Sequence, residues 1–167
     1  MKKIILIFSF LCFACSAKAQ HTQNSINLGL GFYHIDVDMT GNWATGDVPG
    51  VSVGFDNQWT FGTKNNKVLE VAVDLGMVFW IKFEAVNVSA PLLFGYKCGK
   101  KKNIIPKIGI LGGGQFLNDN KYRKELMVGP CTELTLDKKK VSYSIRYFFD
   151  PVTSSKMHEV VFIVGIK

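Results

Sequence analysis

The sequence predicts an all-β protein, an eight-stranded antiparallel up-and-down transmembrane β-barrel (a meander) with a closed lumen. Apolar and polar residues alternate with a period of two along most of the chain, and short turn-forming segments separate the alternating stretches. The N-terminus has the pattern of an export signal. After it, no stretch reaches the roughly 20 apolar residues that a membrane-spanning helix needs, which excludes a helical membrane protein.

Residues 1–19 have the pattern of a cleaved signal peptide. A short cationic start precedes an apolar run over 4–17, and Ala17 and Ala19 are the small residues that signal peptidase requires. We therefore expect a mature protein of residues 20–167, forming one exported β-barrel domain. Three lysines and no acid leave with the signal, so the net charge falls from +7 to +4.

The alternation is clearest over 69–81, where the odd positions are apolar and Glu70 and Asp74 oppose them. An alternating period of two places the apolar residues on one side of a strand, whereas a helix would scatter them. The same pattern along the chain predicts eight strands, at roughly 25–36, 50–61, 67–80, 84–97, 103–116, 122–136, 140–149 and 158–167.

Two strand assignments rest on weaker signals. No turn residue separates the third and fourth strands, and their boundary near Trp80–Glu84 is predicted from a switch of the apolar residues from odd to even positions. The fifth and sixth strands contain Gly112, Gly113, Gly114 and Pro130, and glycine inside a strand commonly marks a bulge or a tight bend.

The connections differ in length along the predicted meander. Short lysine-rich segments at 63–67, 98–103 and 137–140 fall at one end, and the longest connections, 36–50 and 150–157, fall at the other. A transmembrane barrel has tight periplasmic turns and longer outer loops. We therefore expect the lysine-rich end in the periplasm.

A soluble lipocalin-like barrel, which binds an apolar ligand inside, would show the same alternation of apolar and polar residues. Such a soluble periplasmic protein is the alternative prediction. The export signal, the strand lengths and the small residues of the polar face favour the outer membrane. Aromatic residues near the strand ends also resemble the girdles of membrane barrels. These aromatic residues are Trp59, Phe61, Phe79, Tyr96, Tyr147 and Phe149.

An outward apolar face would direct the charged residues of the strands into the lumen. Buried charges are costly unless paired, so we expect internal ionic networks around two cations, Lys107 and Arg146. The set of predicted lumen-facing ionic residues is Asp56, Glu70, Asp74, Lys107, Glu133 and Arg146. A barrel of eight strands has room for side chains and little else, so a diffusion pore is not expected.

Three segments resemble the small PorT-like outer-membrane β-barrels of Bacteroidota. Residues 87–97 (NVSAPLLFGYK) are similar to the fourth-strand signature of that family, residues 108–114 (IGILGGG) to its glycine-rich fifth strand, and residues 144–147 (SIRY) to its Arg-Tyr strand. The resemblance implies an integral outer-membrane protein. The family typically ends in an aromatic residue, whereas this chain ends in Gly165-Ile166-Lys167.

A rim hydrolase is a third hypothesis, because barrel closure brings the first and last strands together. The chemistry would need a base, a serine and an orienting acid. The residues of these types are His34, Asp36, Asp38, Ser154, Ser155, His158 and Glu159. We predict instead that they are polar rim residues, with no catalytic residue, no metal and no cofactor.

The leading prediction is a non-enzymatic protein with a structural or surface-interaction role through outer loops 36–50 and 150–157. Its expected partners are outer-membrane lipid and, during insertion, the barrel-assembly machinery. We expect a monomer that binds no nucleic acid, since no stacking aromatics interleave the lysines. Two of the four cysteines lie in the predicted signal peptide, and the other two, Cys98 and Cys131, are predicted to be free thiols.

Overall fold

The structure is a computed structural model. It describes residues 21–39, 42–61, 66–80, 83–99, 101, 103–118, 122–152 and 158–167. The predicted signal peptide lies outside the described residues. No helix in the described part of the chain has the length and apolar content to cross a membrane.

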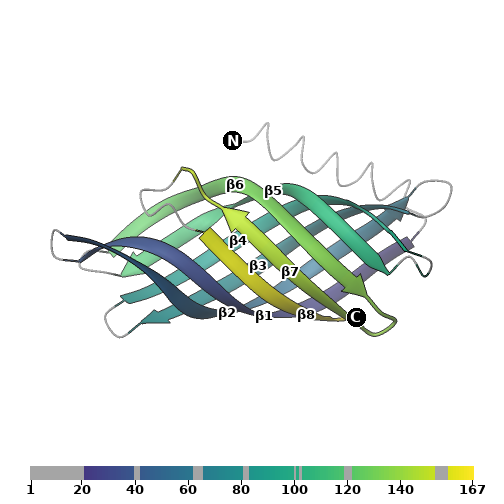
Figure 1. Cartoon of the computed structure of the whole chain (residues 1–167), viewed down its shortest axis with the longest axis horizontal. Coiled ribbons are helices and arrows are strands. Elements are labelled where there is room, and N and C mark those ends of the chain that lie inside the picture. The colour runs from purple at the N-terminus through teal and green to yellow at the C-terminus, as the bar shows by residue number, and fades with distance from the viewer. Residues whose placement is uncertain are drawn as a thin grey trace.

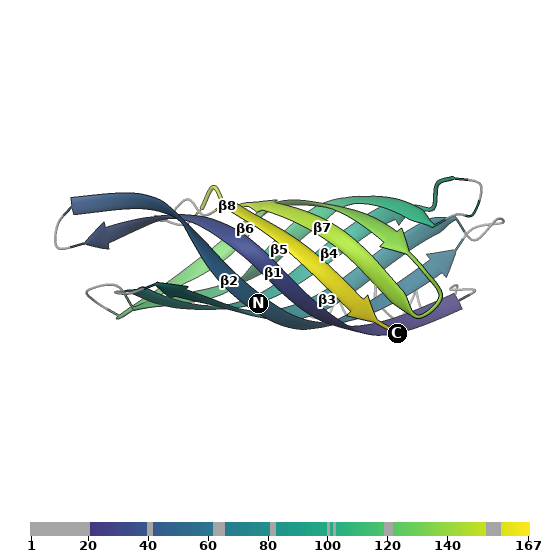
Figure 2. The same cartoon turned by 60° about the horizontal axis from the view of Figure 1, so that its bottom comes forward.

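Eight antiparallel strands form a closed barrel in chain order, and β1 pairs with β8 to complete it (Figures 1 and 2). This confirms the predicted barrel and its up-and-down topology. The strands are β1 (His21–Met39), β2 (Asn42–Phe61), β3 (Lys67–Trp80), β4 (Phe83–Tyr96), β5 (Ile104–Asn118), β6 (Tyr122–Asp137), β7 (Val141–Phe149) and β8 (His158–Ile166).

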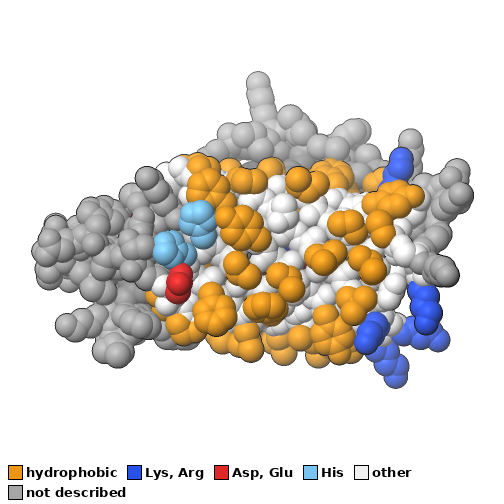
Figure 3. All heavy atoms as spheres, in the orientation of Figure 1, with side chains coloured by type: hydrophobic (Ala, Val, Ile, Leu, Met, Phe, Trp, Pro, Cys, Tyr) orange, Lys and Arg blue, Asp and Glu red, His pale blue; other side chains and the backbone are white. Residues whose placement is uncertain are grey.

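The alternation in sequence becomes an alternation between exterior and interior. On β3, Val73 and Leu75 are 57% and 38% exposed, whereas Glu70 and Asp74 are 1% and 8% exposed. Apolar side chains form a broad band around the outside of the barrel, and charged side chains gather toward its ends (Figure 3). In a water-soluble protein, the apolar side chains face inward and the charged side chains face outward. The barrel has the opposite arrangement, which also differs from that of the soluble lipocalin-like alternative.

The boundary between β3 and β4 lies where the parity switch predicts it. Trp80 ends β3 and pairs with Phe83, which begins β4, so an even number of residues separates the two strands in the sequence. This even spacing moves the apolar face from odd positions on β3 to even positions on β4, where Val88 and Phe94 are exposed. Side-chain parity thus locates a turn that no glycine, proline or asparagine marks.

The glycines of β5 and the proline of β6 do not introduce a bulge. Gly112, Gly113 and Gly114 pair in continuous register with Val128, Met127 and Leu126. Pro130 pairs with Ile110 in the same register. The expectation of a bulge here is therefore wrong, because residue-for-residue pairing continues through the glycines.

The segment 36–50 is not an outer loop, and this prediction is wrong. β1 continues to Met39, β2 begins at Asn42, and the two strands pair up to Met39–Asn42. Pairing of β1 with β8 stops at His34, and pairing of β2 with β3 stops at Gly50. The two strands therefore extend past the barrel as a long hairpin, which projects at the left in Figures 1 and 2.

Proline explains why the sequence suggested a loop there. Pro49 lies on β2 opposite Phe32, one residue beyond the last pair with β3. Proline lacks the N–H that a central strand must donate, but an edge position leaves that side of the strand unpaired. The turn-forming composition of this segment is therefore compatible with a ribbon that pairs on one side only.

Candidate functional site

Five of the six predicted lumen residues meet in one charged cluster inside the barrel. Lys107 on β5, Glu133 on β6 and Arg146 on β7 are neighbours in register, with pairs Lys107–Glu133 and Glu133–Arg146. The lysine Nζ lies 2.7 Å from Glu133 Oε1, and the arginine Nε lies 2.7 Å from Glu133 Oε2. Glu133 therefore bridges two cations along the wall of three adjacent strands.

The other two acids come from β3. Lys107 donates to Glu70, and Arg146 donates through Nη1 to Asp74. Neither contact joins adjacent strands, because β4 separates β3 from β5 and β4, β5 and β6 separate β3 from β7. The cluster thus connects distant parts of the barrel wall through the interior.

Glycine on β4 gives the lysine its path to Glu70. Gly95 pairs with Val68 on one side and with Lys107 on the other. A Cβ atom built on Gly95 would lie 2.8 Å from Lys107 Cγ, closer than real Cβ contacts. The absence of a side chain at this position leaves room for the lysine to cross over β4.

Asp56, the sixth predicted residue, is buried in the interior but stands apart from the cluster. It accepts hydrogen bonds from the Ser25 hydroxyl and, at 3.2 Å, from Asn27 Nδ2, both on β1. It makes no ion pair with another described residue. Polar β1 side chains, rather than cations, therefore satisfy this carboxylate.

Tyr33 and Glu159 are interior residues outside the predicted set of lumen-facing residues. Tyr33 is 1% exposed, and its hydroxyl is hydrogen-bonded to Glu159 on β8. The parity of β8 contained the signal, because Phe162 and Val164 face outward and Glu159 has the opposite parity. Its place as the second residue of the last strand instead favoured the prediction of a rim residue.

The charged cluster fills most of the space around it. Two cavities of about 10 Å³ each lie inside the barrel, one bordered by Asp56 and Glu70 and the other by Tyr33 and Glu159. A cavity of this size holds about one water molecule. Neither of these cavities is large or apolar enough for an apolar ligand.

Histidines from the first and last strands meet at the end of the barrel with the long hairpin. His34 pairs directly with His158 across the β1–β8 seam, and their ring centroids lie 6.0 Å apart. The predicted neighbours Ser154 and Ser155 lie outside the described residues. Asp36 and Asp38 belong to β1, but their side chains are also outside the described part. The described residues therefore show no serine next to this histidine pair.

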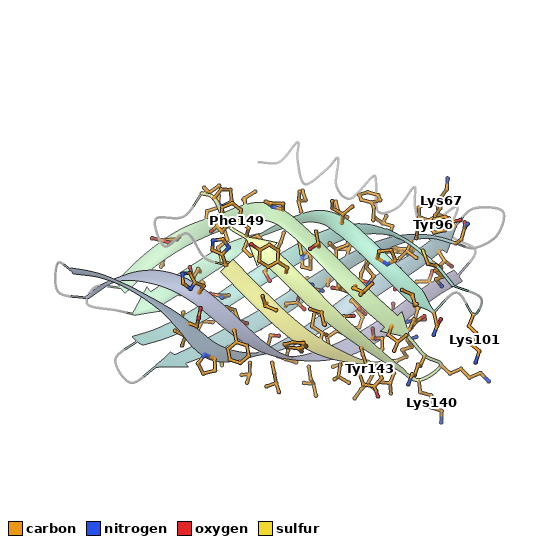
Figure 4. All side chains as sticks on the ribbon, viewed as in Figure 1. Lys67, Tyr96, Lys101, Lys140, Tyr143 and Phe149 are labelled. Atoms are coloured by element: carbon orange, nitrogen blue, oxygen red, sulfur yellow. The ribbon has the colours of Figure 1, made fainter. Side chains whose placement is uncertain are left out.

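The lysine-rich connections lie together at the opposite end of the barrel, as predicted. Lys67, Lys101 and Lys140 project at one end in Figure 4, next to Tyr96 and Tyr143. Lys138 Nζ lies 5.4 Å from the centre of the Tyr143 ring. Aromatic residues therefore border the exterior on this side, with lysines beyond them.

The other predicted girdle residues differ in exposure. Tyr147 is 42% exposed, and Phe149 is partly exposed at the end of β7. Trp59 is only 8% exposed, and its partner Leu69 on β3 is 4% exposed, so this pair is not part of the exposed aromatic surface. The side chain of Phe79 lies outside the described part. Cys98 and Cys131 are free thiols, as predicted.

Comparisons with known proteins show the fold. No protein-family model and no curated protein matches the chain, so the resemblance to PorT-like proteins stays a prediction. Neisserial surface protein A superposes with a TM-score of 0.59 at 12% identity, over 89% of this chain and 99% of that one. The attachment invasion locus protein Ail of Yersinia pestis gives 0.52 at 7% identity, over 85% and 94%. The chain therefore has the fold of small bacterial outer-membrane β-barrels.

Proposed function

We propose that this protein is a monomeric, integral outer-membrane β-barrel with a plugged lumen and a non-enzymatic, structural or surface-interaction role. A single observation carries the proposal: the barrel is apolar outside and charged inside. Export by the N-terminal signal and insertion by the barrel-assembly machinery are parts of the same proposal. Outer-membrane lipid is the partner of its exterior.

The exterior supports a lipid environment because apolar residues are exposed on all sides of the barrel. Leu30 on β1, Ile108 on β5 and Leu126 on β6 are 67%, 65% and 68% exposed. Soluble monomeric proteins rarely expose contiguous apolar patches larger than a few hundred Å². Hydrocarbon tails remove the cost of this exposure, and the closed barrel leaves no unpaired strand edge within the bilayer.

The interior supports a plugged barrel rather than a pore or a ligand carrier. Lys107 and Arg146 make ion pairs across the lumen, and the cavities beside them are about 10 Å³ each. A solute would have to break buried ion pairs to pass, and unpairing a buried charge costs several kcal/mol. The interior is therefore suited to holding the wall together.

The short connections at the lysine-rich end and the long β1–β2 hairpin at the other end support an orientation with the lysine-rich end in the periplasm. Tyrosine side chains prefer the boundary between hydrocarbon and headgroups, and nearby lysines are attracted to anionic headgroups. Tyr96 and Tyr143 with Lys67, Lys101 and Lys140 match this arrangement (Figure 4). The long β1–β2 hairpin and residues 150–157 then face the cell exterior, where a surface interaction would be made.

Recovery of the protein tests the membrane location. The protein should sediment with outer membranes, require detergent for extraction, and migrate differently on gels before and after boiling. Recovery in the soluble periplasmic fraction without detergent would contradict the proposal.

A lysine scan of the exterior tests the lipid contact itself. Ile110→Lys places a charge on the middle of β5, where Ile110 is 57% exposed, and Ile104→Lys is the matched control at the lysine-rich end of the same strand. In a bilayer, the mid-strand lysine costs about 2–4 kcal/mol and the control about 0–1 kcal/mol. The unfolding free energy in lipid vesicles measures both, and equal, small effects would indicate that the outer face contacts water.

A further inference from the structure

The histidine pair at the hairpin end of the barrel has the features of a metal-binding site. His34 on β1 and His158 on β8 are direct partners in the register that closes the barrel. Their rings meet edge to face, with centroids 6.0 Å apart and planes at 75°. Figure 3 shows the two imidazoles side by side near one end of the apolar band, beside an acidic side chain. With metal–nitrogen bonds of about 2.0–2.1 Å, one ion can reach both rings at this centroid distance.

Hydrogen bonds fix which nitrogen of each ring is left for a ligand. His34 Nδ1 lies 2.7 Å from Asp47 Oδ1, so the ring donates its Nδ1 proton to the carboxylate and Nε2 carries the lone pair. His158 Nδ1 lies 2.9 Å from the Tyr147 hydroxyl. No other described residue is hydrogen-bonded to either Nε2 atom. Histidines that bind metals are commonly oriented in this way, by an oxygen on the second ring nitrogen.

The surroundings hold the rings in place and leave them accessible. The His158 ring stacks against the Phe149 ring at a centroid distance of 4.6 Å. The His34 side chain is 43% exposed, and that of Asp47 is 74% exposed. Both histidines lie on the outward face, at the last β1–β8 pair before the hairpin leaves the barrel. An ion in solution can therefore reach them.

We propose that His34 and His158 bind a divalent transition-metal ion, such as Zn²⁺ or Cu²⁺, through their Nε2 atoms. Imidazole nitrogen suits these ions, whereas Mg²⁺ and Ca²⁺ prefer oxygen. In the described part of the chain, no cluster of three or more His, Cys, Asp and Glu side chains forms a complete metal site. Among the described residues, these two histidines are therefore the protein ligands, and water completes the coordination.

Such an ion joins the first strand to the last strand of the barrel. The hydrogen bonds between β1 and β8 run from Ile26–Ile166 to His34–His158, and no turn connects these two strands. A ligand that binds only the folded protein stabilises it by mass action. The bound ion should therefore stabilise the closed barrel at the end where the seam pairing stops.

Metal titration of the mature protein, purified in detergent without a histidine tag, tests the site. We expect Cu²⁺ to give an electron paramagnetic resonance spectrum with two imidazole nitrogens, and Zn²⁺ to bind with one ion per chain by calorimetry. His34→Gln and His158→Gln should each weaken binding by at least about tenfold, and Asp47→Ala by about tenfold. The matched control is His21→Gln, because His21 begins β1 at the opposite end of the barrel.

The expected result is binding at least about tenfold weaker in both single variants and unchanged binding in the control. Heat-modifiable gel migration shows whether each variant still forms the barrel. Zn²⁺ should also raise the urea midpoint of the wild type but not that of His158→Gln. Binding that survives both single substitutions, binding lost in His21→Gln, or the absence of saturable binding by the wild type would overturn the proposal.

Discussion

Arg146 on β7 donates a hydrogen bond to Asp74 on β3, across the interior of the barrel. The two residues are far apart in the sequence and lie on strands that do not pair with each other. The same guanidinium also forms an ion pair with Glu133 on β6, at 2.7 Å. Arg146 therefore links β6 and β3 through the interior. The interior is thus organised around a small number of charges.

Removing this guanidinium should destabilise the barrel. Arg146→Ala leaves Asp74 and Glu133 buried without the arginine, and breaking a buried pair costs about 3–5 kcal/mol. Urea unfolding in lipid vesicles, followed by gel mobility, measures the change. Lys138→Ala is the control, because Lys138 is an exposed lysine just after β6. An Arg146→Ala curve that overlays the wild type would show that the cluster contributes nothing to stability.

Lys107 and Glu70 should be energetically coupled. Lys107→Met leaves two acids without their lysine, and Glu70→Gln removes one acid, so each single change is destabilising. In the double variant, the removal of Glu70 relieves part of the charge imbalance. A double-mutant cycle should therefore give a coupling energy of about 1–3 kcal/mol. Additive effects of the two substitutions would mean that the pair does not interact.

Gly95 should tolerate a methyl group poorly, in contrast to Gly112. Gly95→Ala places its Cβ 2.8 Å from both Lys107 Cγ and the Pro106 carbonyl oxygen, whereas a Cβ on Gly112 meets nothing within 4 Å. We expect Gly95→Ala to destabilise the barrel by about 1–3 kcal/mol, as overpacking commonly does. Gly112→Ala, on the neighbouring strand, should have little effect. Equal unfolding midpoints for the two variants would contradict the crowding at Gly95.

The native cysteines can report the orientation of the barrel in the membrane. Cys98 lies at the lysine-rich end and is partly exposed, whereas Cys131 is 0% exposed. A membrane-impermeant maleimide should leave intact cells unlabelled and should label Cys98 after the outer membrane is permeabilised.

A cysteine at the opposite end provides the matched comparison. Val152, just after β7, is 61% exposed. Val152→Cys in a Cys98→Ser background should be labelled in intact cells. Labelling of Cys98 in intact cells, with Val152→Cys protected, would show that the barrel is inserted the other way round.

The number of strands and the apolar face of each follow from the sequence alone, because both depend on a local period of two. Leu75 and Asp74 are neighbours in the chain, and their opposite directions need no information about the rest of the fold. The break between Trp80 and Phe83 was predictable for the same reason. The length of the β1–β2 hairpin was not predictable in this way. Its glycine and proline content favours turns, and only the pairing of the two strands outweighs this local preference.

Which charges meet inside the barrel depends on the three-dimensional arrangement of the strands. Parity predicted that Glu70, Lys107 and Arg146 share the interior, but it did not show that Asp56 would bond to β1 side chains while Asp74 bonds to Arg146. Those choices depend on the stagger between strands and on barrel closure, which set the height of each residue in the lumen. Closure also places His34 against His158, since their contact exists only because the first strand pairs with the last.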